Sequence, residues 1–127
     1  MGQSPTTLQE GVISLTISDL ASVCGWTLLA GEDGTDNPVD GCYIGDLLSW
    51  VMGRAQSGNV WLTVMGNLNA IAVAALADVS GIVLCEESAL DPDARKRADM
   101  QGIPVYGCTP NLYQTAIEVY QKLNQNE

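Results

Sequence analysis

The 127-residue chain contains no histidine and no phenylalanine, and only five of its residues are lysine or arginine. Without histidine the chain cannot form a Ser-His-Asp triad, a Cys-His dyad or most catalytic zinc sites. The five basic residues stand against 15 aspartates and glutamates, which gives a net charge of −10. Binding to nucleic acid or to an anionic membrane requires clusters of lysine and arginine. We therefore expect neither nucleic acid nor a membrane as a partner.

Long apolar segments are also missing. The longest apolar run covers residues 70–77, well short of the roughly 18 residues that a membrane span needs. Residues 1–11 are polar and lack the cationic and apolar regions of a signal peptide. Hydrophobic residues nevertheless make up 46% of the chain, which is enough for one core. We expect a cytoplasmic protein with a flexible tail over residues 1–13 and one domain over residues 14–124.

The four cysteines contain no C-x-x-C spacing, which makes a zinc ribbon or a thioredoxin-type redox site improbable. They stand at Cys24, Cys42, Cys85 and Cys108. All four neighbour apolar residues, so we expect reduced, buried thiols that behave as small hydrophobic side chains. The alternative is a thiol at a ligand pocket, for which Cys85 and Cys108 are better placed.

Apolar runs and turn residues alternate along the chain in a way that predicts an α/β fold. Short apolar strands alternate with amphipathic helices of 10–15 residues, a pattern typical of a mainly parallel, possibly mixed, β-sheet flanked by helices. We expect strands over 26–30, 39–44, 60–64, 81–85 and 103–106, and helices over 17–23, 46–55, 68–77, 92–101 and 110–123.

Several helix starts carry capping signals. Thr16 and Asp19 have the spacing of a capping box, and Asn67 precedes the helix over 68–77 as an N-cap. Asp91 and Thr109 each precede a proline, which predicts an N-cap followed by proline at the first helical position. The helix over 68–77 is apolar all round, with Leu68, Ile71 and Leu76 expected on one side and Ala70, Ala74 and Ala77 on the other. Such a helix is enclosed or contacts a partner.

The carboxyl ends of the expected strands form the candidate ligand site, because ligands of such sheets bind at that edge. Exposed N–H groups at the helix N-termini there favour an anionic group. Gly66 has no Cβ, so it lets a ligand approach the backbone. The alternative is that these residues only cap helices. The candidate ligand-binding residues are Gly45, Asp46, Gly66, Asn67, Asn69 and Thr109.

Enzyme signatures were not found. Neither lysine follows a glycine as a P-loop requires, and no G-x-G-x-x-G opens a helix. The acidic residues of the loop over 31–40 miss the spacing of a calcium-binding EF-hand. Glu86 and Glu87 form no acid/base pair, and we expect both on the surface. We expect no catalytic residue, no metal, no cofactor and no kinase activity.

Residues 39–49 (VDGCYIGDLLS), 58–63 (GNVWLT), 66–69 (GNLN) and 80–84 (SGIVL) resemble the DRTGG domain family, which is similar to the N-terminal domain of HPr kinase/phosphorylase and to the regulatory region of some phosphotransacetylases. The resemblance extends over about residues 14–123. It implies an α/β domain that acts as a regulatory or ligand-sensing module, and it implies an association of some members with iron-hydrogenase systems.

The chain departs from the family's namesake motif at two places. It has Gly66-Asn67-Leu68 where related domains have Gly-Asp-Arg, and Cys85-Glu86-Glu87 where they end a strand in Thr-Gly-Gly. The arginine that could hold an anion is absent, so the resemblance supports the fold more strongly than a particular ligand.

The prediction is therefore a stand-alone, non-catalytic domain that senses a small molecule. The alternative is an interaction module that docks on a larger enzyme or kinase system, and a weaker one is an enzyme with an unrecognised carboxylate or thiol site. Trp50, on the flank of its helix's apolar stripe, and the uncharged helix over 68–77 further predict a homodimer.

Overall fold

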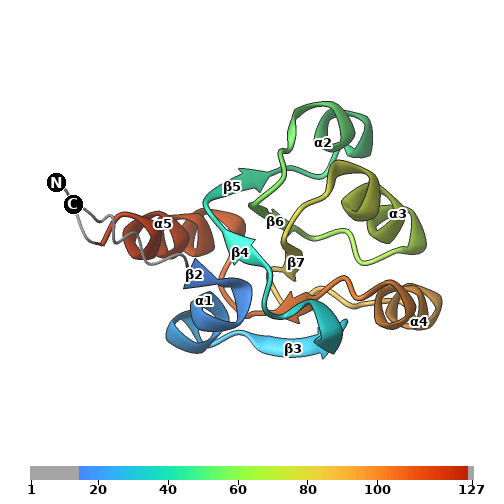
Figure 1. Ribbon diagram of the computed structural model, residues 1–127, viewed down its shortest axis with the longest axis horizontal. Helices are drawn as coiled ribbons and strands as arrows, with labels where there is room; N and C mark the ends of the chain where they lie inside the picture. Colours follow the sequence, from blue (N-terminus) through green and yellow to red (C-terminus); the bar gives the residue numbers. More distant parts are fainter. Residues whose placement is uncertain (1–14, 126–127) are drawn as a thin grey trace, which may run out of the picture.

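The computed structural model describes residues 15–125, so the predicted tail over residues 1–13 lies outside the described residues. The chain follows the expected alternation of strands and helices (Figure 1). In order, its elements are β2 (Leu15–Thr16), α1 (Ile17–Cys24), β3 (Thr27–Ala30), the 3-10 turn η1 (Glu32–Gly34), β4 (Pro38–Val39), β5 (Gly41–Ile44), α2 (Leu48–Arg54), β6 (Asn59–Thr63), α3 (Leu68–Ala77), β7 (Gly81–Leu84), α4 (Pro92–Gln101), β8 (Val105–Gly107) and α5 (Leu112–Leu123).

Five strands form a mixed sheet in the order β3-β8-β7-β6-β5. The pairs β5–β6, β6–β7 and β7–β8 are parallel, and only the edge strand β3 runs antiparallel, to β8. This confirms the predicted mainly parallel α/β domain. A small antiparallel pair, β2–β4, lies outside the main sheet; it was not predicted, because each of its strands has two residues.

The helices cover both faces of the sheet. Figure 1 shows α2, α3 and α4 on one side and α1 and α5 on the other. Each face has its own buried cluster: Trp61, Ile82 and Leu84 contact the first group of helices, and Leu62 and Val83 contact the second. The central strands β6 and β7 are apolar on both faces because both faces are covered. No helix among residues 15–125 is long and apolar enough to cross a membrane.

Helix α3 lies between α2 and α4, which explains its apolar composition. Its buried side contains Ile71 together with Ala70 and Ala74, whereas Leu76 is 72% exposed. The predicted division of this helix into a leucine/isoleucine side and an alanine side is therefore wrong. Alanines face the neighbouring helices because small side chains allow close packing there.

The four capping predictions can be judged at the helix starts. Asp91 stands at the N-cap of α4 and is followed by Pro92, as predicted, but its side chain makes no capping hydrogen bond. The Thr16–Asp19 capping box is present, and the Asn67 side chain accepts a hydrogen bond from the Ala70 N–H at 2.9 Å. The cap predicted at Thr109 is wrong. Asn111 caps α5 by accepting from the Gln114 N–H at 2.9 Å, because the chain bends at Thr109 and Pro110 before the helix begins at Leu112.

The start of α2 also differs from the prediction. The helix begins at Leu48, and Leu47 stands at the N-cap without a side-chain hydrogen bond. Asp46 instead accepts hydrogen bonds from the Thr63 hydroxyl at 2.6 Å and from the Val64 N–H at 3.0 Å. Asp46 thus joins the end of β5 to the end of β6.

The assignment of the α5 cap gives a direct test of stability. We predict that Asn111→Ala lowers the free energy of unfolding by about 0.5–2 kcal/mol, because it leaves a helical N–H without a partner. Thr109→Ala, two residues earlier on the same loop, should change it by less than about 0.5 kcal/mol. Urea unfolding followed by circular dichroism measures both values. A larger loss for Thr109→Ala than for Asn111→Ala would contradict the assigned cap.

Candidate functional site

The connections that leave the strands diverge at one point of the sheet. The chain passes from β5, β6 and β7 to α2, α3 and α4, which share one face, but passes from β8 to α5 on the other face. The loops after β7 and β8, which are neighbouring parallel strands, therefore separate toward opposite faces. A crevice outside the strand ends is the expected result, and ligands of open α/β sheets bind in such crevices.

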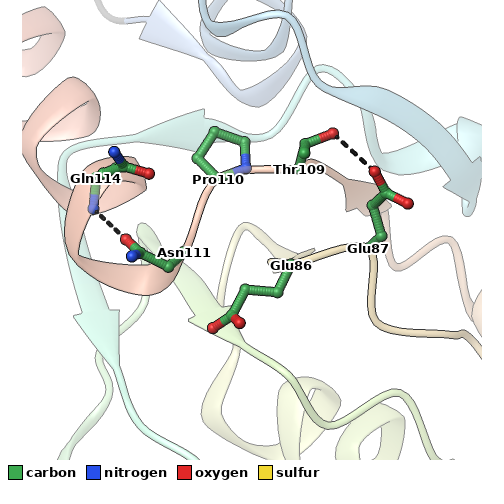
Figure 2. Close-up of a pocket in the computed structure, with 6 residues that line it drawn as sticks. All are labelled: Glu86, Glu87, Thr109, Pro110, Asn111 and Gln114. Carbon is green, nitrogen blue, oxygen red and sulfur yellow. Dashed lines mark hydrogen bonds between the residues drawn. The ribbon is translucent and has the colours of Figure 1, made fainter.

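A cavity of about 500 Å³ lies at this point. Figure 2 shows the Glu87 carboxylate, on the segment after β7, pointing toward Thr109 on the segment that enters α5, whereas the Glu86 side chain extends away from Thr109. The Thr109 hydroxyl donates a hydrogen bond to a Glu87 carboxylate oxygen at 3.2 Å. The cavity is lined by Glu86, Glu87, Thr109, Pro110, Asn111 and Gln114.

Main-chain hydrogen bonds hold the two segments together. The Glu86 N–H donates to the Pro110 carbonyl at 3.1 Å, and the Glu87 N–H donates to the Cys108 carbonyl at 2.8 Å. The Ser88 hydroxyl donates to the Cys85 carbonyl at 2.7 Å and tightens the turn. The floor of the cavity is thus fixed by the backbone, and its walls consist of side chains.

Glu86 and Glu87 have left-handed backbone conformations, with φ of 58° and 56°. A side chain in this region costs about 1–2 kcal/mol per residue, and two consecutive non-glycine residues there are unusual. Such backbone strain is often found at functional sites. The backbone at these two positions therefore has a conformation that suits glycine, while the side chains are carboxylates.

The side chains of the cavity set its electrostatic character. Among the described residues, neither this cavity nor the adjoining one is lined by a lysine or an arginine. Both glutamates are exposed, and the side-chain amides of Asn111 and Gln114 offer donors and acceptors. This arrangement favours a neutral or cationic polar molecule and disfavours a polyanion.

A second cavity, of about 350 Å³, adjoins the first and shares two of its residues. It extends toward the edge strand β3, and it gives the Cys108 side chain access to solvent. It is lined by Thr27, Leu29, Glu87, Ser88, Gly107, Cys108 and Thr109.

The structure places the six sequence-predicted site residues at three strand ends. Of the six, only Thr109 lines the cavities between β7 and β8. Gly45 and Asp46 lie at the end of β5, where the Trp61 indole N–H donates to the Gly45 carbonyl at 2.8 Å. Asn67 caps α3, and Asn69 is exposed in the first turn of that helix.

Gly66 serves a different purpose from the one predicted for it. A Cβ at this position would lie 2.0 Å from the Ala89 carbonyl oxygen, and the Gly66 carbonyl accepts a hydrogen bond from the Asp91 N–H at 2.8 Å. The β7–α4 loop, not a ligand, occupies the space that the glycine leaves free.

Sequence reasoning missed most of the residues that line the first cavity. Glu86 and Glu87 were expected on the surface, which is confirmed, but no site role was predicted for them. Asn111 and Gln114 were not selected at all. The asparagine after Thr109-Pro110 could have indicated them, because asparagine is among the preferred N-cap residues.

The four cysteines are free thiols, but they are not all buried as predicted. Cys42 is exposed on the edge strand β5, Cys24 and Cys108 are half-buried, and Cys85 is fully buried. Burial raises the pKa of Cys24 to about 11. A hydrogen bond from the Cys85 thiol, together with the nearby Thr115 hydroxyl, lowers the pKa of Cys108 to about 7. The same pairing with Cys108 and burial raise the pKa of Cys85.

Among residues 15–125, no three cysteine, aspartate or glutamate side chains gather closely enough to hold a metal ion. The chemistry available at the cavity is therefore hydrogen bonding by amides, carboxylates and one hydroxyl, with a thiol nearby.

No protein-family model matches the chain, and no curated protein matches it in sequence. Among solved structures, the chain is similar to the CBS and DRTGG domains of the regulatory region of a pyrophosphatase from Clostridium perfringens, in complex with its activator diadenosine tetraphosphate. The TM-score is 0.67 with 9% sequence identity, over 84% of this chain and 46% of that chain. This chain thus corresponds to about half of that structure. The likeness establishes a DRTGG-like fold.

The strained glutamates give a prediction that separates conformation from charge. Glu86→Gly and Glu87→Gly should each raise the free energy of unfolding by about 0.5–1 kcal/mol, because glycine adopts the left-handed region without steric cost. Glu86→Gln and Glu87→Gln remove the same charge but keep the side chain, and should change stability by less than about 0.5 kcal/mol. Equal effects of glycine and glutamine, measured by urea unfolding, would contradict backbone strain at this turn.

Proposed function

We propose that the chain is a non-catalytic regulatory domain that binds a small polar molecule at the ends of β7 and β8. The observation that carries this proposal is the cavity of about 500 Å³ between the segments that leave those strands. Its floor is a hydrogen-bonded backbone, and two of its residues hold strained conformations. The DRTGG-like fold supports a regulatory role, because the similar pyrophosphatase structure is that of a regulatory region with a bound activator.

The ligand that fits this cavity is neutral or positively charged. The carboxylates of Glu86 and Glu87 line it, the chain has a net charge of −10, and no cationic side chain lines it. A polyphosphate such as the activator of the pyrophosphatase would be repelled unless a cation came with it. A protonated amine would donate hydrogen bonds to the carboxylates and to the amide oxygens, and a polar neutral molecule could in addition accept them from the amide N–H groups.

The composition supports a binding role over catalysis. The described cavity contains no nucleophile with an adjacent base, and the chain lacks histidine altogether. The docking alternative, in which the domain attaches to a larger enzyme, has no comparable support, because the site at the strand ends is hollow and polar. Of the six residues predicted from sequence, Thr109 belongs to the proposed site.

Native mass spectrometry of the purified full-length chain tests the proposal by detecting a co-purified small molecule. Gln114→Ala should lower the retained fraction, because it removes an amide from the cavity wall. Asn111→Ser should lower it as well, since serine still caps the helix but removes the side-chain amide from the cavity wall. Gln121→Ala, an exposed glutamine on the same helix, serves as the matched control and should retain the molecule.

Two results would count against this proposal. A bound molecule whose retention is the same in Gln114→Ala, Asn111→Ser and Gln121→Ala would place the site elsewhere. Binding of diadenosine tetraphosphate to the full-length chain without magnesium, measured by calorimetry, would contradict the proposed class of ligand.

We further propose that the chain forms a homodimer through the exposed edge of β5. The outer edge of β3 is protected, because the Arg95 guanidinium donates to the Leu29 carbonyl and the strand has a register shift. Strand β5 has no strand partner on its outer edge among residues 15–125. Beside it, Ile44 and Tyr120 border a cavity of about 410 Å³ between β5 and α5. An unprotected edge with an apolar flank favours pairing with a second copy.

Trp50, which the sequence indicated as an interface residue, is a weaker candidate. Its ring lies 3.7 Å from the Arg54 guanidinium, so a cation of the same helix already covers part of it. The apolar surface at β5 and α5 has no such cover among the described residues.

Light scattering tests the dimer. Ile44→Lys should shift the full-length chain toward the monomer, because lysine on an edge strand opposes pairing. The added positive charge reduces the repulsion between two acidic copies, so any dissociation must come from the blocked edge. Leu76→Lys makes the same charge change on α3 and should leave the dimer intact. A particle of 13.5 kDa at micromolar concentrations of the unmodified chain would refute the proposal.

A further inference from the structure

Cys85 and Cys108 occupy neighbouring positions where β7 and β8 end. In the parallel pair of β7 and β8, Val83 lies opposite Tyr106 and Leu84 lies opposite Gly107. The next residue of each segment is a cysteine, so the same register places Cys85 opposite Cys108. The hydrogen bond from the Cys108 N–H to the Leu84 carbonyl, at 3.0 Å, continues the pairing to this point. Both side chains pack with the cluster on the α1 and α5 side of the sheet.

This placement meets the distance requirement of a disulfide. Neighbouring strands lie about 4.8 Å apart, and the Cα atoms of disulfides are separated by about 4.4–6.8 Å. The two side chains pack into the same cluster, and each thiol shifts the pKa of the other. No large movement of either strand is needed to join them.

The two thiols differ in access. Cys85 is fully buried, whereas Cys108 lines the cavity of about 350 Å³ beside the proposed ligand site. The Cys108 sulfur also lies 3.6 Å from the Thr115 hydroxyl oxygen, which can stabilise a thiolate. An incoming reagent can therefore reach Cys108 but not Cys85.

We propose that Cys85 and Cys108 form a redox-active dithiol beside the ligand cavity, which a small-molecule disulfide converts to an intramolecular disulfide. The pair combines an accessible attacking thiol with a buried resolving thiol on the next strand. The pKa of Cys108, which is lowered to about 7, supports this order of events. A thiol with a pKa near the ambient pH attacks disulfides most effectively.

The exchange takes place in two balanced steps. The Cys108 thiolate attacks one sulfur of the small disulfide, forms a mixed disulfide and releases one small thiolate. Cys85 then gives up its proton and attacks the Cys108 sulfur, which releases the second small thiolate. In total, two protein thiols are oxidised to one disulfide, and one small disulfide is reduced to two thiols.

The disulfide would join the segments that form the floor of the ligand cavity. The backbone bonds of Glu86 and Glu87 already connect these segments, and a covalent link between Cys85 and Cys108 would restrict their separation. An influence of oxidation on ligand binding rests on the proposed function, whereas formation of the disulfide does not.

The test treats the reduced full-length chain with oxidised glutathione near neutral pH and maps its peptides without reduction. We expect one intramolecular link between Cys85 and Cys108 and a chain that has lost two hydrogens. Cys85→Ala should stop at the first step and carry glutathione on Cys108. Cys108→Ser should acquire neither the link nor glutathione on Cys85. Circular dichroism confirms that each variant is folded, and Cys85→Ser replaces the alanine variant if that one is not.

The variant Cys24→Ser,Cys42→Ser is the matched control, because it removes the other two thiols and should still form the link. A link that includes Cys24 or Cys42, or stable glutathione on Cys108 in the unmodified chain without closure, would overturn the proposal.

Slower amide exchange over residues 86–88 and 109–111 after oxidation is expected, and this readout requires no ligand. If the disulfide forms but the retained fraction of ligand does not change, the influence of oxidation on ligand binding is contradicted, whereas the proposed dithiol is not.

Discussion

Backbone pairing between β7 and β8, continued past the ends of both strands, is the constraint on which the candidate site depends. The Glu87 N–H reaches the Cys108 carbonyl and the Glu86 N–H reaches the Pro110 carbonyl, so the segment after β7 is held against the segment after β8. To make both bonds while turning toward α4, the chain passes through two consecutive left-handed residues. The strain, the cavity and the neighbouring thiols all follow from this one junction.

The junction also explains why the site lies between β7 and β8 and not between β5 and β6. The connections after β5, β6 and β7 all lead to the same face, so their loops run side by side and cover one another. The Ala89 backbone fills the space at Gly66, and Asp46 closes the gap between β5 and β6 by bonding to Thr63 and Val64. Of the parallel strands β5, β6, β7 and β8, the last alone is followed by a helix on the opposite face, which opens the sheet edge beside it.

Much of the fold was predictable from sequence, because it depends on local patterns. Apolar strands separated by turn residues, the Thr16 capping box and the Asn67 cap are signals within a few residues of each other. The candidate site was less predictable, since its features depend on contacts between distant segments. The role of Gly66 depends on Ala89, and the left-handed glutamates depend on carbonyls more than 20 residues away. Spacing along the chain predicted that Thr109 caps α5, but the chain bends at Thr109 and Pro110, beside the segment of Glu86 and Glu87, and the cap falls on Asn111.

The two glutamates show how one backbone can serve different ligands. A Gly-Gly turn at this place leaves an uncharged backbone surface, whereas Glu86 and Glu87 impose two negative charges on a cavity without a lining cation. Both glutamates are exposed, and an exposed ion pair contributes about 0.2–1 kcal/mol. That energy is of the same order as the backbone strain of either residue, so the two charges bias the proposed site toward neutral or cationic ligands. In the proposed site the junction of β7 and β8 would set where a ligand lies, and the side chains at residues 86 and 87 would set which charge it carries.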